Sequence, residues 1–298
     1  MKTLTHTPAT TGQKRQITRV GSDAIEQVLE DLGISKDGAQ RVHASGDEFA
    51  KAIHEVAKAK ILDLSVTDKY KNEEVESSYG YLSGYKKPRG ITEQTNRLRE
   101  LIPGVGYADE QIAQGELPKN AEGWFAIPKW QSVAPTYAEA VQKVFDLIKE
   151  TRGKFYNYCD GQITNERLRQ SIKTQGVFDQ FAEAQKGYDI LVIPAQFGIL
   201  HRGRSVRRAL EVMIDQGKFG LDAFAIGIML LTHPERLENC DDLWIDCAGD
   251  EFDDPDSDAS FGRAPYFVFN CGKVKFGTNG VVNASDGYGS ASGFVPQS

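Results

Sequence analysis

Apolar residues recur at helical spacing through the first 65 residues of the chain. A helix over 22–32 is predicted because Ser22 can cap its start and Gly33 can end it. Its apolar residues share one face: Ile25, Val28, Leu29 and Leu32. The same signals predict a short helix over 35–42 and a third helix that begins at Ser45.

The pattern divides the chain into four segments. Residues 1–20 are polar and lack periodicity, so we expect a mobile tail there, followed by a small helical block over 21–65. Residues 66–90 (VTDKYKNEEVESSYGYLSGYKKPRG) are charged and then rich in Tyr, Gly and Ser, which indicates a linker or an extended arm. The remaining residues, 91–298, form the predicted α/β domain.

The first part of that domain is mainly helical in pattern. Helices are predicted from Thr92, over 136–153 and over 164–187, where Thr or Gly residues mark the ends. A short apolar run at 124–127 predicts a strand.

Two continuous apolar runs distinguish the second half of the chain. Residues 188–197 (YDILVIPAQF) and 243–247 (LWIDC) are typical of strands buried on both faces, and two predicted helices separate them. Strand, helices and strand in that order favour a parallel crossover within one sheet. A hairpin that turns at Cys271 and Gly272 is expected next, and the Gly- and Ser-rich end is expected to be irregular. The predicted fold class is therefore α/β, a mixed sheet with a parallel crossover unit and a C-terminal antiparallel hairpin, preceded by a small helical block.

Composition narrows the class of protein without identifying a function. The 298 residues are 40% hydrophobic and 26% charged, which suffices for a large core. The net charge is −7, but ten acids and no Lys or Arg fall between 237 and 260, so the rest of the chain is mildly basic. No Cys-x-x-Cys pair, apolar leader or membrane-length apolar run occurs, and a soluble, cytoplasmic protein without a membrane partner is expected.

Several stretches resemble an uncharacterised family of bacterial hypothetical proteins. They are AEGWFAIPKW, VIPAQFGILHRGRSVRR, FAIGIMLLTHPERL, DLWIDCAGDE and GSASGFVPQ. The resemblance covers residues from about 79 to the C-terminus. The family has no assigned fold or activity, so the resemblance implies no catalytic residues.

The most distinctive local motif is the basic loop that follows the first apolar run. It combines His201, two glycines and a helix cap with four arginines, and the candidate ligand-binding residues are Arg202, Gly203, Arg204, Ser205, Arg207 and Arg208. A helix N-terminus attracts anions, and guanidinium groups match phosphate or carboxylate geometry. The loop matches neither the Walker A nor the Rossmann pattern. Internal ion pairing is the alternative, and the sequence favours it.

The acidic segment after the second apolar run is the other candidate site. Asp246, Asp250 and Glu251, with His201, could carry out a metal-assisted reaction, because ligands in open α/β sheets bind beyond the strand ends. Loop 198–205 and segment 246–251 are expected to lie close together on one side of the sheet. A salt-bridge network between them is the simpler interpretation.

Two weaker motifs were weighed as sites. Asp254, Asp256 and Asp258 alternate as in a calcium loop, but Ala259 and Pro265 replace the required Gly and Glu, so a solvated acidic loop is favoured. The first two predicted helices have a spacing near that of a helix-turn-helix. Gly38 in the second helix favours a plain helical bundle instead.

Three classes of function follow from these motifs. The first is binding of a phosphate-bearing small molecule or nucleic acid through loop 198–208. The second is a metal-assisted hydrolase that uses the acidic run 246–251. The third is a structural or interaction protein, including one associated with a virus, without catalysis. No cofactor is predicted, a divalent metal is compatible with the second class, and no pattern indicates an oligomeric state.

Overall fold

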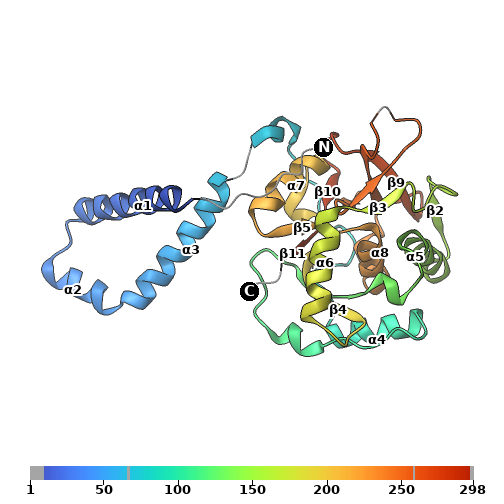
Figure 1. Ribbon diagram of the computed structural model, residues 1–298, viewed down its shortest axis with the longest axis horizontal. Helices are drawn as coiled ribbons and strands as arrows, with labels where there is room; N and C mark the ends of the chain where they lie inside the picture. The colour runs from blue at the N-terminus through green and yellow to red at the C-terminus, as the bar shows by residue number, and fades with distance from the viewer. Residues whose placement is uncertain (1–9, 66–67, 258, 296–298) are drawn as a thin grey trace. The chain divides into compact units, whose positions relative to one another are not determined.

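The structure is a computed structural model that describes residues 10–65, 68–257 and 259–295. The chain forms two compact units, residues 1–65 and 66–298 (Figure 1). Within the described residues, no helix is both long and apolar enough to cross a membrane.

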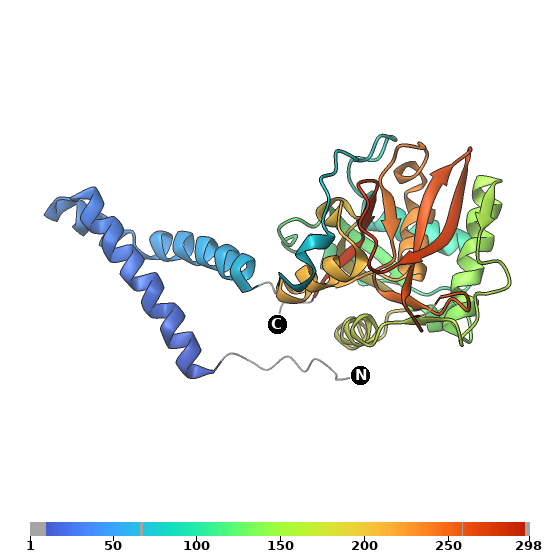
Figure 2. The same ribbon diagram turned by 90° about the horizontal axis from the view of Figure 1, so that it is seen from above.

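The first unit contains three helices, α1 (Thr11–Leu32), α2 (Lys36–Ala44) and α3 (Gly46–Ser65) (Figure 2). The helical block is therefore confirmed. The prediction of a mobile tail over 1–20 is wrong for residues 11–20, because these residues are helical. Residues 1–9 lie outside the described part of the chain. Helix α1 begins early because Thr10 and Gln13 form a capping box. It ends where predicted, at Gly33 in the left-handed conformation.

The second unit combines helices with two sheets. Residues 66–90, interpreted from the sequence as a linker or an arm, belong to this unit. Its α-helices are α4 (Ile91–Leu101), α5 (Tyr137–Arg152), α6 (Ile172–Ala184), α7 (Val206–Asp215) and α8 (Ala223–Thr232). Its short 3-10 helices are η1 (Asp68–Glu73), η2 (Glu110–Gln114), η3 (Trp130–Ser132), η4 (Ile199–His201) and η5 (Pro234–Arg236).

The first sheet has four strands in the order β1-β4-β11-β5, and every neighbouring pair is antiparallel. Its strands are β1 (Gly123–Pro128), β4 (Ile190–Gln196), β5 (Lys218–Gly220) and β11 (Ser292–Phe294). Every residue of β4 is buried, as its unbroken apolar run predicts.

The second sheet has seven strands, with the order β10-β6-β8-β7-β3 and with β9 between β8 and β2. The strands are β2 (Phe155–Asn157), β3 (Leu168–Gln170), β6 (Trp244–Asp246), β7 (Asp250–Phe252), β8 (Arg263–Asn270), β9 (Lys273–Gly280) and β10 (Tyr288–Ser290). The pairs β10–β6 and β2–β9 are parallel, so this sheet is mixed. The predicted hairpin is confirmed as β8–β9, which turns at Cys271 and Gly272.

The α/β class is correct, but the predicted parallel crossover between the two apolar runs is wrong. The first run forms β4 and the second forms β6, and these strands lie in different sheets. The C-terminal segment, expected to be irregular, supplies β10 beside β6 and β11 beside β4. β11 therefore occupies one edge of β4, and β10 occupies one edge of β6, so the two strands do not pair with each other.

Helix α8 lies at the centre of the second unit. All of its residues from Ala223 to Thr232 are buried, and it packs against α5 and β1. At Gly227 an added Cβ would lie 2.4 Å from Val144 of α5 and 3.6 Å from Phe267 of β8. The missing side chain therefore lets α8 approach α5 closely while it also touches the second sheet.

Candidate functional site

The basic loop leads from β4 to the N-terminus of α7. Ser205 caps this helix as predicted, because its hydroxyl accepts a hydrogen bond from the Arg208 amide at 3.1 Å. Gly203 has a φ of 76°, and a Cβ there would lie 2.2 Å from the Val75 carbonyl oxygen. The glycine thus permits a close backbone approach, but the approaching backbone is the chain's own segment 73–75 rather than a ligand.

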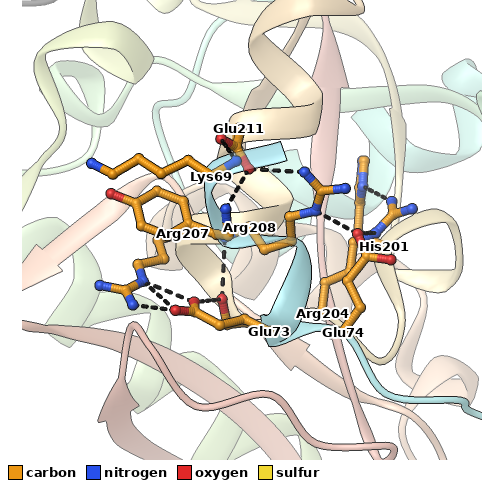
Figure 3. A network of polar contacts seen from close by, with 10 residues as sticks. Lys69, Glu73, Glu74, His201, Arg204, Arg207, Arg208 and Glu211 are labelled. Atoms are coloured by element: carbon orange, nitrogen blue, oxygen red, sulfur yellow. Dashed lines mark hydrogen bonds and ion pairs between the residues drawn. The ribbon is translucent and has the colours of Figure 1, made fainter. Parts of the chain in front are cut away.

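Glu73 places a carboxylate at the N-terminus of α7 (Figure 3). It accepts a hydrogen bond from the Ser205 hydroxyl at 2.7 Å and from Arg207 Nε at 2.9 and 2.8 Å. The hydrogen bonds from Arg207 lower the pKa of the Glu73 carboxyl. The position that the sequence predicts for an external anion therefore holds an internal one.

Arg204 and Arg208, which Figure 3 also shows, have partners within the second unit as well. Arg208 is 5% exposed and lies between Glu74 and Glu211, with the latter at 2.8 Å. Arg204 Nε lies 3.3 Å from Glu74. The exposed Arg202 donates a hydrogen bond to the Tyr79 carbonyl at 2.9 Å. Arg204, Arg207 and Arg208 are thus paired inside the chain, but their partners are Glu73, Glu74 and Glu211 and not the acidic segment that the sequence had suggested.

Glu211 extends the same network to the backbone of η1. Its two carboxylate oxygens accept hydrogen bonds from the Lys69 amide at 3.0 Å and the Tyr70 amide at 3.2 Å. The Arg207 guanidinium also lies 4.3 Å from the centre of the Tyr70 ring. Segment 68–75 is therefore fastened to α7 by charged, aromatic and backbone contacts at once.

His201 is fully buried beneath this network. Its Nδ1 lies 3.3 Å from an Arg204 nitrogen, and its Nε2 has no hydrogen-bond partner among the described residues. Burial, followed by the charges of Arg204 and Lys218, lowers the pKa of His201 well below its usual value. A ring with so low a pKa is a weak base, and it is closed off from solvent and from any substrate, which does not suit a role as a general base.

The acidic segment does not pair with the arginines. Asp250 accepts hydrogen bonds from the Tyr137 hydroxyl at 2.7 Å and the Ala223 amide at 2.6 Å, while Glu251 pairs with Arg169 at 2.7 Å. Strand β10 separates the basic loop from β6, since Gly289 bridges to Arg202 on one side and pairs with Ile245 on the other. The expected salt-bridge network between the two segments is wrong for the described side chains.

Asp246 differs from its neighbours because it is buried without a partner. Its side chain makes no hydrogen bond or ion pair with any described residue, and the residue is 4% exposed. Burial raises the pKa of the Asp246 carboxyl to about 8. The sequence identified this residue as a candidate, but the neutral, enclosed carboxyl is unsuited to binding a metal ion.

The calcium-like motif is engaged in local contacts. Asp254 pairs with Arg263 at 3.2 Å and accepts a hydrogen bond from the Asp256 amide, and Asp258 lies outside the described residues. Asp254 and Asp256 border an open pocket of about 480 Å³. Across the described ranges, no group of three or more His, Cys, Asp or Glu side chains could hold a metal ion. The metal-assisted hydrolase therefore lacks a ligand cluster in this part of the chain.

Two buried carboxylates meet at the N-terminus of α8, and the sequence analysis missed one of them. Asp222 caps the helix by accepting a hydrogen bond from the Ala225 amide at 2.7 Å, and Asp250 accepts from Ala223. Burial raises the pKa of the Asp222 carboxyl to about 6. Burial and the charge of Asp222 raise the pKa of the Asp250 carboxyl well above its usual value. An acid before the apolar run AFAIGIML is a helix-start signal that could have identified Asp222.

A second buried polar cluster was also missed. The Glu122 carboxylate accepts hydrogen bonds from the hydroxyls of Tyr81 and Tyr85, at 2.5 and 2.9 Å. The fully buried Arg236 lies 3.8 Å from the centre of the Tyr81 ring and donates to the carbonyl of Leu243. The cluster ties segment 79–85 to the core.

The first unit presents an exposed apolar surface. No described side chain of α1 or α2 is buried. Large apolar side chains that are more than one third exposed lie on all three helices and in the turn between α1 and α2: Ile17, Val20, Val28, Leu29, Leu32, Ile34, Val42, Phe49 and Val56. Exposed apolar surface of this kind is typical of interaction sites.

No family model, curated protein or solved structure matches the chain.

Proposed function

We propose that this chain is an interaction protein that assembles with a second copy of itself through helix α1. The observation that carries the proposal is the exposed apolar face of this 22-residue helix. The proposal narrows the structural or interaction class predicted from the sequence. It also agrees with the internal use of the basic loop, whose arginines already have carboxylate partners.

Helix α1 needs a partner for its own stability. An isolated helix is marginal in water, and helices in proteins owe most of their stability to packing of an apolar face. The apolar positions of α1 recur every three or four residues along one side, and Val20 and Leu32 are 69% and 67% exposed. Burying this face against another helix would provide the missing packing.

The charges of α1 are arranged unfavourably for a helix that acts alone. The first half carries Lys14, Arg15 and Arg19, and the second half carries Asp23, Glu26, Glu30 and Asp31. This order opposes the helix dipole, which favours acids near the N-terminus and bases near the C-terminus. The arrangement is therefore explained better by a partner than by helix stability.

An antiparallel second copy fits both the charges and the shape. It would bring the basic half of each helix beside the acidic half of the other, whereas a parallel copy would bring like charges together. In a register centred between Ser22 and Asp23, Gly21 of each helix meets Ala24 of the other. These small residues would let the two backbones approach at the crossing point.

The test is the oligomeric state of the full chain, measured by sedimentation velocity at low and high micromolar concentrations. We expect a dimer, and we expect the double variant Val20→Asp/Val28→Asp to be monomeric. Both positions are more than half exposed, so the substitutions remove little packing from within the monomer. Ile172→Asp is the matched control, because Ile172 is an exposed apolar residue of the second unit and its variant should remain dimeric.

Salt tests the orientation separately. Screening weakens attraction between opposite charges, so added sodium chloride should loosen an antiparallel dimer. A dimer that tightens with salt would contradict the antiparallel arrangement. A chain that stays monomeric at every concentration, or a dimer that persists in the double variant, would overturn the proposal.

A further inference from the structure

A small pocket of about 130 Å³ opens on the second unit beside the N-terminus of α8. Its apolar wall comes from β1, β4, α6 and α8, with side chains of Ile127, Leu191, Phe178, Ala182 and Phe224. None of the candidate residues from the sequence analysis lines it. Its lining residues belong neither to the basic loop nor to helix α1.

The buried carboxylate of Asp222 lines the pocket and is held by hydrogen bonds. Asp222 is 1% exposed, and its Oδ2 accepts a hydrogen bond from Gln170 Nε2 at 2.6 Å while its Oδ1 accepts from the Ala225 amide. The Phe224 amide is a third donor to this carboxylate, so one of its four acceptor positions is left for a ligand. Because these partners hold the carboxylate in place, it is preorganised to accept a hydrogen bond from a ligand.

The lining of the pocket also includes an aromatic ring and several polar side chains. Trp130 lines it together with Lys129, Gln131, Gln175 and Asp179. None of these four polar side chains makes a hydrogen bond or ion pair with another residue that the structure describes. They are therefore available to hydrogen-bond donors and acceptors on a ligand.

The lining of the pocket carries charges of both signs. Asp222 and Asp179 face Lys129 and the positive end of the α8 dipole, so a ligand with a single net charge would meet both attraction and repulsion. Hydroxyl groups both donate and accept hydrogen bonds, as the glutamine amides do, and they suit such a mixed lining. The apolar face of a ring would pack on Trp130 and Phe178.

We propose that this pocket binds a neutral polyhydroxylated ring, the chemistry of a single neutral sugar unit, with Asp222 as the acceptor for one of its hydroxyls. A cavity of about 150 Å³ holds one benzene ring, so this pocket of about 130 Å³ would enclose one side of a sugar ring and leave the rest of the ring at its opening. A nucleotide or a longer chain is larger still. The proposal concerns binding alone. It is independent of the proposed assembly, because every residue that carries it belongs to the second unit.

The test is isothermal titration calorimetry of the full chain with a panel of neutral pyranoses and cyclic polyols, each beside its amino-sugar and uronic-acid counterpart. We expect at least one neutral member to bind saturably and both charged counterparts to bind more weakly. Asp222→Asn should lower the affinity about tenfold or more, because it removes a hydrogen bond to a charged acceptor.

The variant separates binding from stability. Asn caps helices as well as Asp does, so Asp222→Asn should fold and retain the start of α8. Asp109→Asn is the matched control: Asp109 caps η2, does not line the pocket, and its variant should bind like the unchanged protein. The proposal fails if no neutral member binds, if a charged counterpart binds more tightly, or if Asp222→Asn binds unchanged.

Discussion

The Glu73 carboxylate and the Arg207 guanidinium form an ion pair at the N-terminus of α7, in which Arg207 Nε donates to both carboxylate oxygens at 2.9 and 2.8 Å. The two residues are 134 positions apart in the sequence. The pair fastens segment 68–75 to the loop that the sequence identified as an anion site. The Glu73 carboxylate thus occupies the position at which an external anion would bind.

Removing the internal anions should expose an anion site. In the variant Glu73→Ala/Glu74→Ala, Arg204 and Arg207 lose their carboxylate partners at the start of α7, and inorganic phosphate should then bind there. Phosphate should raise the unfolding temperature of this variant, because a ligand that binds only the folded state stabilises it. The unchanged protein should show no such rise. Sodium chloride at equal ionic strength is the control, and equal responses of both proteins to phosphate would contradict the prediction.

Burial should decide which arginine of the loop matters for stability. Arg208→Ala should lower the free energy of unfolding by about 3 kcal/mol, because it leaves the buried Glu211 without its guanidinium partner. Arg204→Ala should cost only about 1 kcal/mol, since Arg204 and Glu74 are both partly exposed. Urea unfolding followed by tryptophan fluorescence measures the second unit alone, because all three tryptophans lie in it. An equal drop in the free energy of unfolding in the two variants would contradict the prediction that the buried Arg208 contributes more than Arg204.

Gly203 should control the attachment of segment 73–75. Gly203→Ala forces a Cβ toward the Val75 carbonyl, and it should break the hydrogen bond from the Val75 amide to the Gly203 carbonyl, now 2.8 Å long. Gly217→Ala is the matched control, because Gly217 also has a positive φ but has open space around its Cβ position. Hydrogen exchange at the Val75 amide should accelerate in the first variant only. Similar acceleration in both would point to backbone strain in place of the steric contact.

Asp246 should make the second unit less stable as the pH rises from 6.5 to 8. Its pKa is about 8 in the folded chain and near 3.8 when unfolded, so in this range the folded state holds a proton that the unfolded state has lost. Stability therefore falls with rising pH, by up to about 1.4 kcal/mol per unit. The buried Asp250 acts in the same direction, so the comparison with a variant is required.

The variant Asp246→Asn isolates that contribution. It keeps the shape of the side chain and removes its titration. The free energy of unfolding should therefore fall by about 2 kcal/mol less between pH 6.5 and 8 than it does in the unchanged protein. Urea unfolding at several pH values, again followed by tryptophan fluorescence, provides the measurement. An unchanged slope in the variant would show that Asp246 is ionised in the folded chain throughout this range.

Local signals in the sequence determined several elements correctly. The apolar run before Phe197 forms the fully buried strand β4, and Thr136 with Gly153 marks the ends of α5 as predicted. The hairpin turn at Cys271 and Gly272 and the Ser205 cap also lie where the pattern placed them. Each of these depends on residues that are neighbours in the chain, so capping, turn geometry and burial pattern suffice to predict it.

Tertiary structure alone decided which partner each element and each charge would find. The sequence could not indicate that β4 pairs with a three-residue strand at Ser292–Phe294, because a short Gly- and Ser-rich strand has almost no propensity signal of its own. Nor could it indicate that Arg207 pairs with Glu73 instead of a nearby acid, or that Asp222 and Asp250 share one helix end. Strand partners and ion pairs form between residues that folding brings together. Coulomb attraction depends on that final distance and not on separation along the chain.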